Sequence, residues 1–390
     1  MKPPLTRPES ATRRWLLHQA LLSAPAMGAT ALWSDTAFAA PPAAARKQVT
    51  LQAGEPLRFP QDFGAHPAYK TEWWYLTGTL QTAPTNTQPL PQAFGFQITF
   101  FRSRVDAARA SPSRFAAKQL VFAHTALTDL NRQQLLHDQR IARAGFGLVD
   151  AAEGDTRITL RDWTLQRSGQ ATQSRYTSHV AARDFTLDLA FTQTQPLLLQ
   201  GDAGWSRKGP QPEQASRYYS QPQLRVTGQL QYRQQTWPVQ GQAWLDHEWS
   251  EALLDPDAVG WDWVGMNLQD GSALTAFRLR RADGSTLWSG GSLRQPGQPS
   301  RSFTNGEVRF TPGRLWLSPA TGARYPVEWQ LDLPGGRYTV RARLDNQELD
   351  SRLSTGGVYW EGLSSLLDAQ GREVGTGYLE MTGYAAALKL

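Results

Sequence analysis

Apolar and polar residues alternate with a period of two along most of this 390-residue chain. The clearest runs are 185–191, 224–232 and 327–333. Such alternation is typical of half-buried antiparallel strands, and no long amphipathic helix competes with it. The sequence therefore predicts an all-β fold with few short helices, at 107–117 and 251–258. Further strands are expected near 72–80, 94–102, 119–128, 157–165, 310–317 and 357–362.

Glycine-containing turns connect several of these runs. Asp270-Gly271 and Asp283-Gly284 offer the positive φ that tight hairpin turns require. Residues 260–293 are therefore expected to form a three-strand meander. Pro334-Gly335-Gly336 predicts one more hairpin.

Several predicted strands are apolar on both faces. Trp73 and Tyr75 point to one side of their strand, and Trp74 points to the other. A barrel that encloses a ligand cavity needs such strands, because one face lines the lumen and the other meets a neighbouring core or domain. The length of the chain suggests two domains. We therefore expect two consecutive antiparallel β-barrel domains, at 51–240 and 241–390.

The N-terminus has the features of an export signal. Arg13-Arg14 precede a short apolar run, and Ala37-Phe38-Ala39 matches a small-residue cleavage site. A permanent membrane anchor needs about 20 apolar residues, and this run is shorter and contains Pro25. The sequence predicts a twin-arginine signal peptide at 1–39, a linker at 40–50, and a periplasmic or secreted location.

Composition excludes several classes of function. Cysteine is absent, which rules out disulfides, thiolate metal sites and a cysteine nucleophile. The formal net charge of +6 is modest and no lysine and arginine run occurs, so nucleic acid is not expected as a partner. No G-x-S-x-G motif, phosphate loop or dinucleotide fingerprint is present, so serine-hydrolase and nucleotide chemistry have no support.

Two neighbouring segments, 244–249 and 261–263, gather four tryptophans, two aspartates, a glutamate and one of only six histidines. Strand alternation sends His247 to one face and Asp246 and Glu248 to the other. An acid and a base beside aromatic walls suit proton transfer to an apolar substrate, and they equally suit passive binding of a lipid tail or a plain packed strand. The catalytic candidates are His247, Asp246, Glu248 and Asp262.

A second aromatic cluster lies at 66–75. Glu72 beside three aromatic residues could be a carboxyl group with a raised pKa, since burial disfavours its ionised form. Alternatively, it bonds backbone amides or an arginine at the start of a strand. His124 shares a strand face with Leu120 and Phe122 and is expected to point inward. The candidate ligand-binding residues are Glu72, Trp73, Trp74, Tyr75, His124, Trp249, Trp261 and Trp263.

Histidines could also coordinate a metal. His66, His124 and His247 with a carboxylate are the available donors, but neither H-x-H nor H-E-x-x-H spacing occurs. The sequence therefore predicts no metal site and no cofactor.

With these residues established, the chain resembles the family of AttH-type lipocalin-like exported proteins and carotenoid 1,2-hydratases, also called hydroxyneurosporene synthases. Six segments carry the resemblance, in order over nearly the whole chain after the signal. They are HPAYKTEWWYLTG at 66–78, FGFQITFFR at 94–102, FAHTALTD at 122–129, WLDHEWS at 244–250, GWDW at 260–263 and GYLEMTGY at 377–384. The resemblance implies two lipocalin-like barrels, export, and for some members an ABC export system.

The hydratase branch of that family uses an H-x-W motif and an acid on the following strand that protonates the substrate. His247 and Trp249 match the motif. The next predicted strand, 274–279, contains no carboxylate. If the chain catalyses such a reaction, Asp246, Glu248 or Asp262 would have to supply the proton.

These features support three functional hypotheses. The first is an exported protein that binds a lipid or another apolar small molecule and works beside an ABC transporter, with aromatic walls from Trp73, Tyr75, Trp249, Trp261 and Trp263. The alternative is a hydratase or secreted hydrolase that uses His247 with a neighbouring acid. The third is a scaffold that presents its barrel ends to a membrane complex. We expect the Glu72 and His247 clusters to meet in space, because each combines an acid with aromatic residues at the start of a predicted domain.

Overall fold

The structure is a computed structural model that describes residues 53–84 and 90–388. The predicted export signal at 1–39 and the linker at 40–50 lie outside the described residues. Export by the twin-arginine route and a periplasmic or secreted location therefore stay predictions. No helix among the described residues is long and apolar enough to cross a membrane.

Thirteen antiparallel strands form the first sheet. Their order is β4-β3-β2-β1-β13-β12-β9-β8-β7-β6-β5, and β10 and β11 also pair with β12. In chain order the strands are β1 (Thr71–Thr82), β2 (Ala93–Arg104), β3 (Gln119–Asp129), β4 (Gln134–Arg143), β5 (Val149–Ala151), β6 (Arg157–Leu160), β7 (Trp163–Ser168), β8 (Arg175–Ala181), β9 (Phe185–Thr192), β10 (Leu198–Leu199), β11 (Trp205–Arg207), β12 (Ala215–Tyr232) and β13 (Gln235–Ala252).

The two ends of the first sheet approach each other, so the sheet nearly closes into a barrel. Strands β3 and β4 contact β5 and β6. Arg140 on β4 bridges this seam, because it bonds the Asp162 carboxylate and donates to the carbonyl of Ala181 at the end of β8. Closure protects the strand edges that would otherwise be exposed.

Ten antiparallel strands form the second sheet, in the order β17-β16-β15-β14-β25-β24-β22-β21-β18, and β23 pairs with β24. Two further strands, β19 (Leu315–Leu317) and β20 (Arg324–Pro326), pair with each other. The strands of the second sheet are β14 (Gly260–Leu268), β15 (Ala273–Arg280), β16 (Thr286–Arg294), β17 (Arg301–Phe303), β18 (Arg309–Pro312), β21 (Glu328–Leu333), β22 (Gly336–Ala342), β23 (Glu348–Ser351), β24 (Gly357–Leu367) and β25 (Glu373–Met381).

The all-β prediction is confirmed. The described residues contain only two short 3-10 helices, η1 (Gln61–Phe63) and η2 (Asp106–Ala108). The three-strand meander over 260–293 is present as β14, β15 and β16. Gly271 and Gly284 in its turns have φ of +86° and +83°, as the Asp-Gly signal predicts.

Three local predictions need correction. The strand expected at 157–165 is a hairpin of two strands, because the chain turns at Arg161, whose φ is 61°. The strand expected at 310–317 ends at Pro312, which has no amide hydrogen to continue a ladder. The helical turn expected at 251–258 is absent, since β13 continues to Ala252 and irregular backbone follows.

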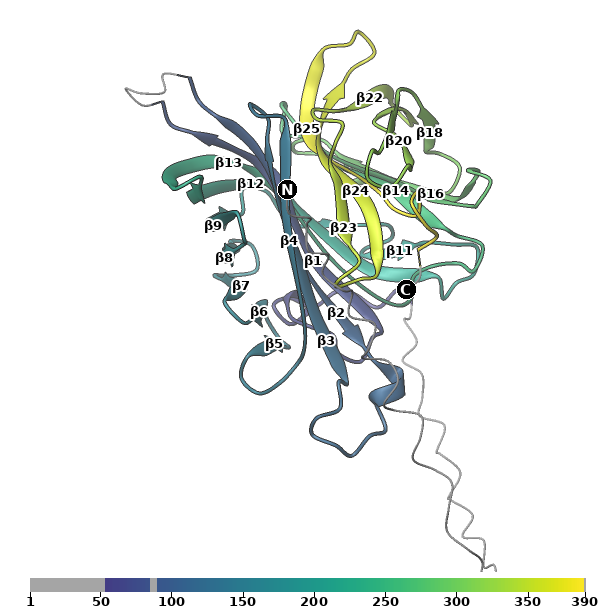
Figure 1. Ribbon diagram of the computed structural model, residues 1–390. Coiled ribbons are helices and arrows are strands. Elements are labelled where there is room, and N and C mark those ends of the chain that lie inside the picture. Colours follow the sequence, from purple (N-terminus) through teal and green to yellow (C-terminus); the bar gives the residue numbers. More distant parts are fainter. Residues whose placement is uncertain (1–52, 85–89, 389–390) are drawn as a thin grey trace, which may run out of the picture. The chain divides into compact units, whose positions relative to one another are not determined.

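Alternation along the strands divides most buried apolar side chains of the described residues into three large clusters, and a small fourth cluster holds Trp205 and Ala215. The first fills the interior of the first sheet, the second packs on one face of the second sheet, and the third lies between the sheets. In Figure 1 the long strands β1 to β4, β12 and β13 lie between the short strands β5 to β9 and the yellow strands β24 and β25. The long strands β1 and β13 are therefore buried on both faces, which explains their doubly apolar sequences.

The position of the open cavity differs from the position expected from the sequence. The sequence places a ligand inside the barrel lumens. The structure fills the interior of the first sheet with side chains such as Trp74, Phe96, Trp163 and Leu245, and it leaves an open cavity between the sheets. The first sheet also extends about a dozen residues beyond the expected boundary at 240, because β13 belongs to it as a whole.

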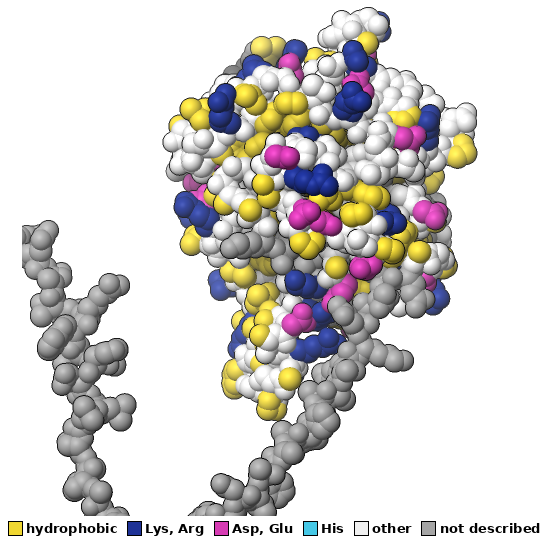
Figure 2. All heavy atoms as spheres, turned by 90° about the vertical axis from the view of Figure 1, so that its right-hand side faces the viewer, with side chains coloured by type: hydrophobic (Ala, Val, Ile, Leu, Met, Phe, Trp, Pro, Cys, Tyr) yellow, Lys and Arg dark blue, Asp and Glu magenta, His cyan; other side chains and the backbone are white. Residues whose placement is uncertain are grey.

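Charged side chains on one face of the molecule do not gather by sign. On the face shown in Figure 2, basic and acidic side chains lie interspersed among apolar ones. This distribution agrees with the modest net charge of the chain.

The close pairing of β1 with β13 yields a test of the fold. A Cβ atom at Gly78 would lie 2.2 Å from the backbone oxygen of Gln242, so Gly78→Ala must displace backbone. We expect this change to lower the free energy of unfolding by about 1–3 kcal/mol, measured by urea denaturation. Gly357→Ala is the control, because nothing lies within 4 Å of its Cβ position. Equal stability of the two variants would contradict the observed strand contact.

Candidate functional site

Strand β13 connects two different environments. It lies between β1 and β12, and its side chains alternate between the interior of the first sheet and the space between the sheets. His247 faces Trp74 of β1 and Tyr219 of β12 in the interior. Asp246 and Glu248 line the cavity on the other side. The predicted separation of these residues between two faces is confirmed.

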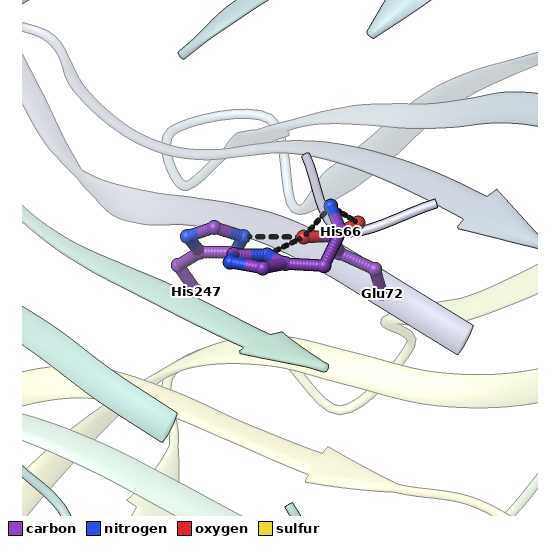
Figure 3. Close-up of side chains that lie close together, drawn as sticks. All are labelled: His66, Glu72 and His247. Atoms are coloured by element: carbon purple, nitrogen blue, oxygen red, sulfur yellow. Dashed lines mark hydrogen bonds and ion pairs between the residues drawn. The ribbon is translucent and has the colours of Figure 1, made fainter. Parts of the chain in front are cut away.

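The interior side holds a compact cluster of His66, Glu72 and His247 (Figure 3). The Oε1 atom of Glu72 lies 2.7 Å from His66 Nδ1 and 3.0 Å from His247 Nε2. The His66 ring stacks on Trp249 with centroids 3.7 Å apart, and His247 stacks on Trp74 at 4.5 Å. The two sequence clusters therefore meet in space, as predicted.

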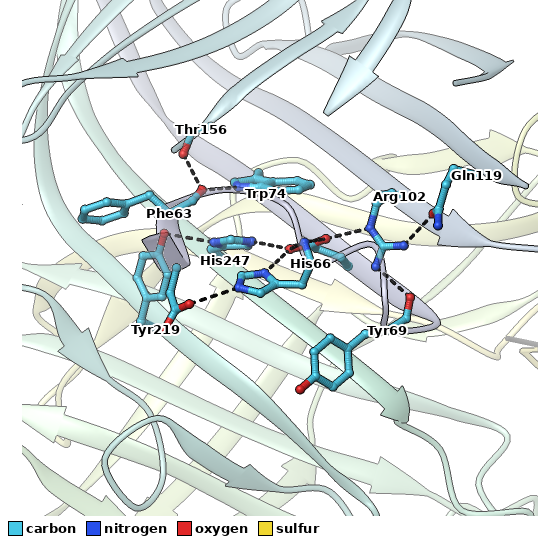
Figure 4. A network of polar contacts seen from close by, with 11 residues as sticks. Phe63, His66, Tyr69, Trp74, Arg102, Gln119, Thr156, Tyr219 and His247 are labelled. Atoms are coloured by element: carbon cyan, nitrogen blue, oxygen red, sulfur yellow. Dashed lines mark hydrogen bonds and ion pairs between the residues drawn. The ribbon is translucent and has the colours of Figure 1, made fainter. Parts of the chain in front are cut away.

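Further hydrogen bonds extend this cluster into the network of Figure 4. Arg102 Nε donates to Glu72 Oε2 at 2.7 Å, and the backbone N–H of His66 donates to the same oxygen at 2.8 Å. Arg102 also donates to the side chain of Gln119 and to the carbonyl of Tyr69. Glu72 thus bonds a backbone amide and an arginine, which is the structural alternative that the sequence left open.

Electrostatics determine the protonation states in this cluster. Burial alone would lower the pKa of His66, but the negative charge of Glu72 and hydrogen bonds to Asp62 and Glu72 raise it to about 8. Burial alone would raise the pKa of Glu72, but the charge of His66 and hydrogen bonds from both histidines hold it well below its usual range. Burial lowers the pKa of His247 to about 4 against the opposing effect of Glu72.

A consistent hydrogen-bond direction follows from these states. Protonated His66 donates to ionised Glu72, and neutral His247 donates to it through Nε2–H. The Nδ1 atom of His247 is then an acceptor for the Tyr219 hydroxyl at 3.0 Å. Each polar atom of the two histidines has a partner, so the cluster works as a brace between β1, β2, β12 and β13.

His66, Glu72 and His247 are also a set of metal donors. One ligand atom of each lies within 4.8 Å of the others, and two histidines with a carboxylate are a donor set that Zn²⁺ accepts. Spacing rules did not find this group, because His247 lies 175 positions after Glu72 in the sequence. The same atoms already form a complete ion-pair network, in which Arg102 supplies positive charge.

The cavity on the other face of β1 and β13 has a volume of about 580 Å³. This volume lies within the usual range of small-molecule sites. Aromatic and aliphatic side chains from both sheets form most of its wall. They include Trp73, Tyr75, Phe101, Leu120, Phe122, Tyr218, Trp261, Trp263, Phe277, Leu279 and Tyr359.

Asp246 is a buried acid in this wall. Its Oδ1 accepts hydrogen bonds from Ser220 Oγ at 2.5 Å and Trp244 Nε1 at 2.7 Å, and its Oδ2 accepts from the Tyr218 hydroxyl at 2.8 Å. Burial raises the pKa of Asp246 to about 7, against the effect of these hydrogen bonds. The Tyr218 oxygen also accepts from Trp263 Nε1 at 3.2 Å. The Tyr218 hydroxyl, which hydrogen bonds the Asp246 carboxyl group, belongs to a residue that also lines the cavity.

Glu248 has a different environment from Asp246. Lys208 Nζ lies 2.9 Å from its Oε1, and Ser216 donates to the same oxygen. Because Lys208 lies against the Tyr218 and Phe277 rings, this ion pair is held in place within the cavity wall. Glu248 is thus a paired carboxylate, whereas Asp246 is surrounded by neutral donors.

His124 also lines the cavity. Its Nδ1 lies 2.8 Å from the Tyr359 hydroxyl and its Nε2 lies 2.8 Å from Ser354 Oγ. Burial lowers the pKa of His124 to about 3, with a small contribution from His137. His124 is therefore neutral near pH 7 and helps to join β3 to β24.

The structure divides the predicted site residues into three groups. Trp73, Tyr75, His124, Asp246, Glu248, Trp261 and Trp263 line the cavity, and Glu72 borders it although its carboxylate bonds His66 and His247 on the interior side. Trp74, His247 and Trp249 pack in the interior of the first sheet. Asp262 points to the opposite side of β14 from Trp261 and Trp263, where it pairs with Arg278 Nε at 2.7 Å and accepts from Tyr384. The structure therefore does not bring His247 or Asp262 to the cavity.

Sequence reasoning missed two further acids in the cavity wall, Glu361 of β24 and Glu380 of β25. Glu361 is the one acid of β24, whereas β25 contains Glu380 and, at its exposed start, Glu373. Glu380 even lies inside one of the segments that carry the family resemblance. An isolated acid in a doubly buried strand was the available signal.

Comparisons with known proteins agree with this architecture. A family model described as AttH-like matches residues 50–384. A protein from Nitrosomonas europaea provisionally described as AttH has a solved structure that is 45% identical, with a TM-score of 0.78 over 86% of this chain and 99% of that chain. A comparison with curated proteins finds no match.

A more distant solved structure is kievitone hydratase from Nectria haematococca. It has a TM-score of 0.65 at 14% identity, over 87% of this chain and 96% of that chain. At this identity the likeness concerns the fold alone. The predicted resemblance and the lipocalin-like fold are confirmed. Association with an ABC export system stays a prediction.

The raised pKa of His66 yields a test of the brace. A histidine whose pKa is higher in the folded than in the unfolded state adds stability below its unfolded pKa, and this stability is lost as pH rises through the folded pKa. Relative to His66→Gln, the wild type should lose about 2 kcal/mol of unfolding free energy between about pH 6 and pH 9. Urea denaturation across this range measures the difference. A difference that does not change with pH would contradict a charged His66.

Proposed function

The chain belongs to the AttH-like family, and on that premise we propose that it binds an apolar small molecule in the cavity between its two sheets. The observation that carries this proposal is the cavity of about 580 Å³ with its aromatic wall. A site of this volume suits a ligand of lipid or polyene character, because such a molecule gains free energy from each apolar surface that it removes from water.

The arrangement of the cavity supports a built site rather than a packing gap. Its wall comes from β1, β2, β3 and β13 of one sheet and from β14, β15, β24 and β25 of the other. Trp73 and Trp261 are only partly buried, so indole surface remains available to a ligand. Aromatic surface that makes no packing contact loses dispersion energy, and a bound apolar molecule would supply that contact.

Acid catalysis is a second candidate function, which the environment of Asp246 favours. Its pKa of about 7 leaves a large share of the carboxyl group protonated near neutral pH, beside an apolar cavity. A protonated acid there could add its proton to one carbon of an alkene while a water oxygen bonds the other carbon. The proton that water then releases would restore Asp246, so the net reaction adds water to the double bond.

This second candidate uses a different residue from the H-x-W histidine. His247 does not line the cavity, and its Nε2 hydrogen bonds Glu72 on the interior side. Under this proposal His247 positions β13 and does not touch substrate. The likeness to kievitone hydratase is compatible with hydration chemistry on this fold.

Binding can be tested with all-trans-retinol, a neutral polyene. We expect it to quench tryptophan fluorescence, and Trp73→Leu to weaken its affinity about 10-fold through lost aromatic contact. Trp316→Leu is the matched control, since Trp316 packs against the second core cluster and does not line the cavity. Equal effects of the two substitutions, or no saturable quenching by retinol, would contradict the proposed site.

Catalysis can be tested with retinol and farnesol in ¹⁸O-labelled water. We expect a hydrated product that carries the label, formed at a rate that falls as pH rises through about 7 because Asp246 loses its proton. Asp246→Asn should reduce the rate at least about 100-fold while retinol binding is retained. His247→Gln should change the rate far less. Absence of labelled product, or an active Asp246→Asn protein, would eliminate the second candidate.

A further inference from the structure

Two glutamates lie directly opposite each other in the cavity wall. Glu361 of β24 and Glu380 of β25 are cross-strand partners, so their side chains share one face. That face is the cavity face, because both residues line the cavity while their neighbours Trp360, Leu379 and Met381 pack in the core of the second sheet. Like charges at directly opposed positions destabilise a sheet unless something neutralises them.

The protein itself supplies little to neutralise this pair. Only Arg102 and Lys208 are basic among the residues that line the cavity. Arg102 is bonded to Glu72, and Lys208 to Glu248. His124 is neutral at physiological pH. Protons or a ligand must therefore neutralise the negative charge of Glu361 and Glu380.

Hydrogen bonding around the pair is also incomplete. Gln97 Nε2 donates to Glu361 Oε2 at 2.7 Å. Glu361 Oε1, Gln97 Oε1 and the Tyr75 hydroxyl make no hydrogen bond of regular geometry with the described residues, although the Tyr75 hydroxyl lies close enough to Glu361 to lower the pKa of that carboxyl group. All three side chains are more than nine-tenths buried and line the cavity. Buried polar atoms without hydrogen-bond partners are rare, and a polar group of a ligand is one source of the missing hydrogen bonds.

Aromatic rings lie beside these carboxyl groups. Trp263 is the register partner of Glu380 on β14, and Trp261 on the same strand face hydrogen bonds Glu380. Tyr75 and Tyr359 lie on the Glu361 side. Aromatic faces next to carboxylates are the surroundings that an organic ammonium ion prefers.

We infer that Glu361 and Glu380 form a subsite for the ammonium group of an amphiphilic amine, whose apolar chain lies along the aromatic wall of the cavity. This inference rests on the proposed ligand binding and specifies the head group of the ligand. The ammonium group donates to Glu361 Oε1 and to the Glu380 carboxylate, and its charge replaces the protons that these groups otherwise hold.

Proton exchange is the physical basis of the subsite. Burial and the charge of Glu380 raise the pKa of Glu361, and burial raises the pKa of Glu380, so the empty pair keeps protons near neutral pH. The other titratable groups that face the pair are Tyr75, Asp246, Glu248, Tyr359 and Tyr378. None of these is a cation, so ammonium binding must release protons from the carboxyl pair.

Titration calorimetry at about pH 8 with decylamine, decanol and decane-1-sulfonate tests the inference, since these probes share one chain length. We expect decylamine to bind at least about 10-fold more tightly than decanol, and the sulfonate most weakly. Measurements in two buffers of different ionisation enthalpy should show release of about one to two protons with decylamine and none with decanol.

Variants separate the head-group effect from the cavity itself. Glu361→Gln combined with Glu380→Gln should reduce decylamine affinity to that of decanol, while decanol and retinol still bind in the cavity. Glu153→Gln makes the same kind of substitution at an exposed loop position, so it is the control and should change nothing. If decanol and retinol bind but decylamine binds no better and releases no protons, the inference is wrong and the binding proposal stands. If none of these probes binds, the binding proposal itself fails.

Discussion

The ionised carboxylate of Glu72 is the interaction on which the central sheet depends. A charge buried this deeply is tolerated only because His66, His247, Arg102 and a backbone amide all bond it. These partners come from the segment before β1, from β2 and from β13, so one carboxylate joins elements that are distant in the sequence. The same strands form one wall of the cavity. Rigidity on the interior side therefore fixes the side chains on the cavity side.

Burial of both faces of β13 separates two kinds of chemistry that adjoin in the sequence. His247 belongs to a satisfied network in which burial keeps it neutral. Asp246, one residue earlier, faces an apolar cavity in which burial instead favours its protonated form. Adjacent residues thus have opposite roles, because the pleat sends them to environments that contain different partners. Bracing accounts for the position of His247, whereas the proposed reactivity and ligand recognition depend on the acids in the cavity wall.

Local sequence patterns predict much of the fold, and the errors of this prediction also have local causes. Period-two alternation and Asp-Gly turns predicted the meander of β14 to β16, and six ordered segments predicted the family. The hairpin at Arg161 was missed because a non-glycine residue adopts positive φ there, without the usual turn signal. The open cavity lies between the sheets and not inside the barrels, a position that alternation cannot predict because it identifies only which side chains share a face. It does not identify which of two buried faces is filled.

The sequence by itself determined the all-β class, the family, the two faces of β13 and the aromatic character of the candidate site. These properties depend on the period of the strand and on residue types, which are local. Only the tertiary structure decided that His66 and His247 bond the same carboxylate oxygen of Glu72. It also decided that Asp262 faces away from the cavity and that Glu361 and Glu380 face into it. Strand order, register and the packing of one sheet on another set these contacts, and they join residues as far as 264 positions apart.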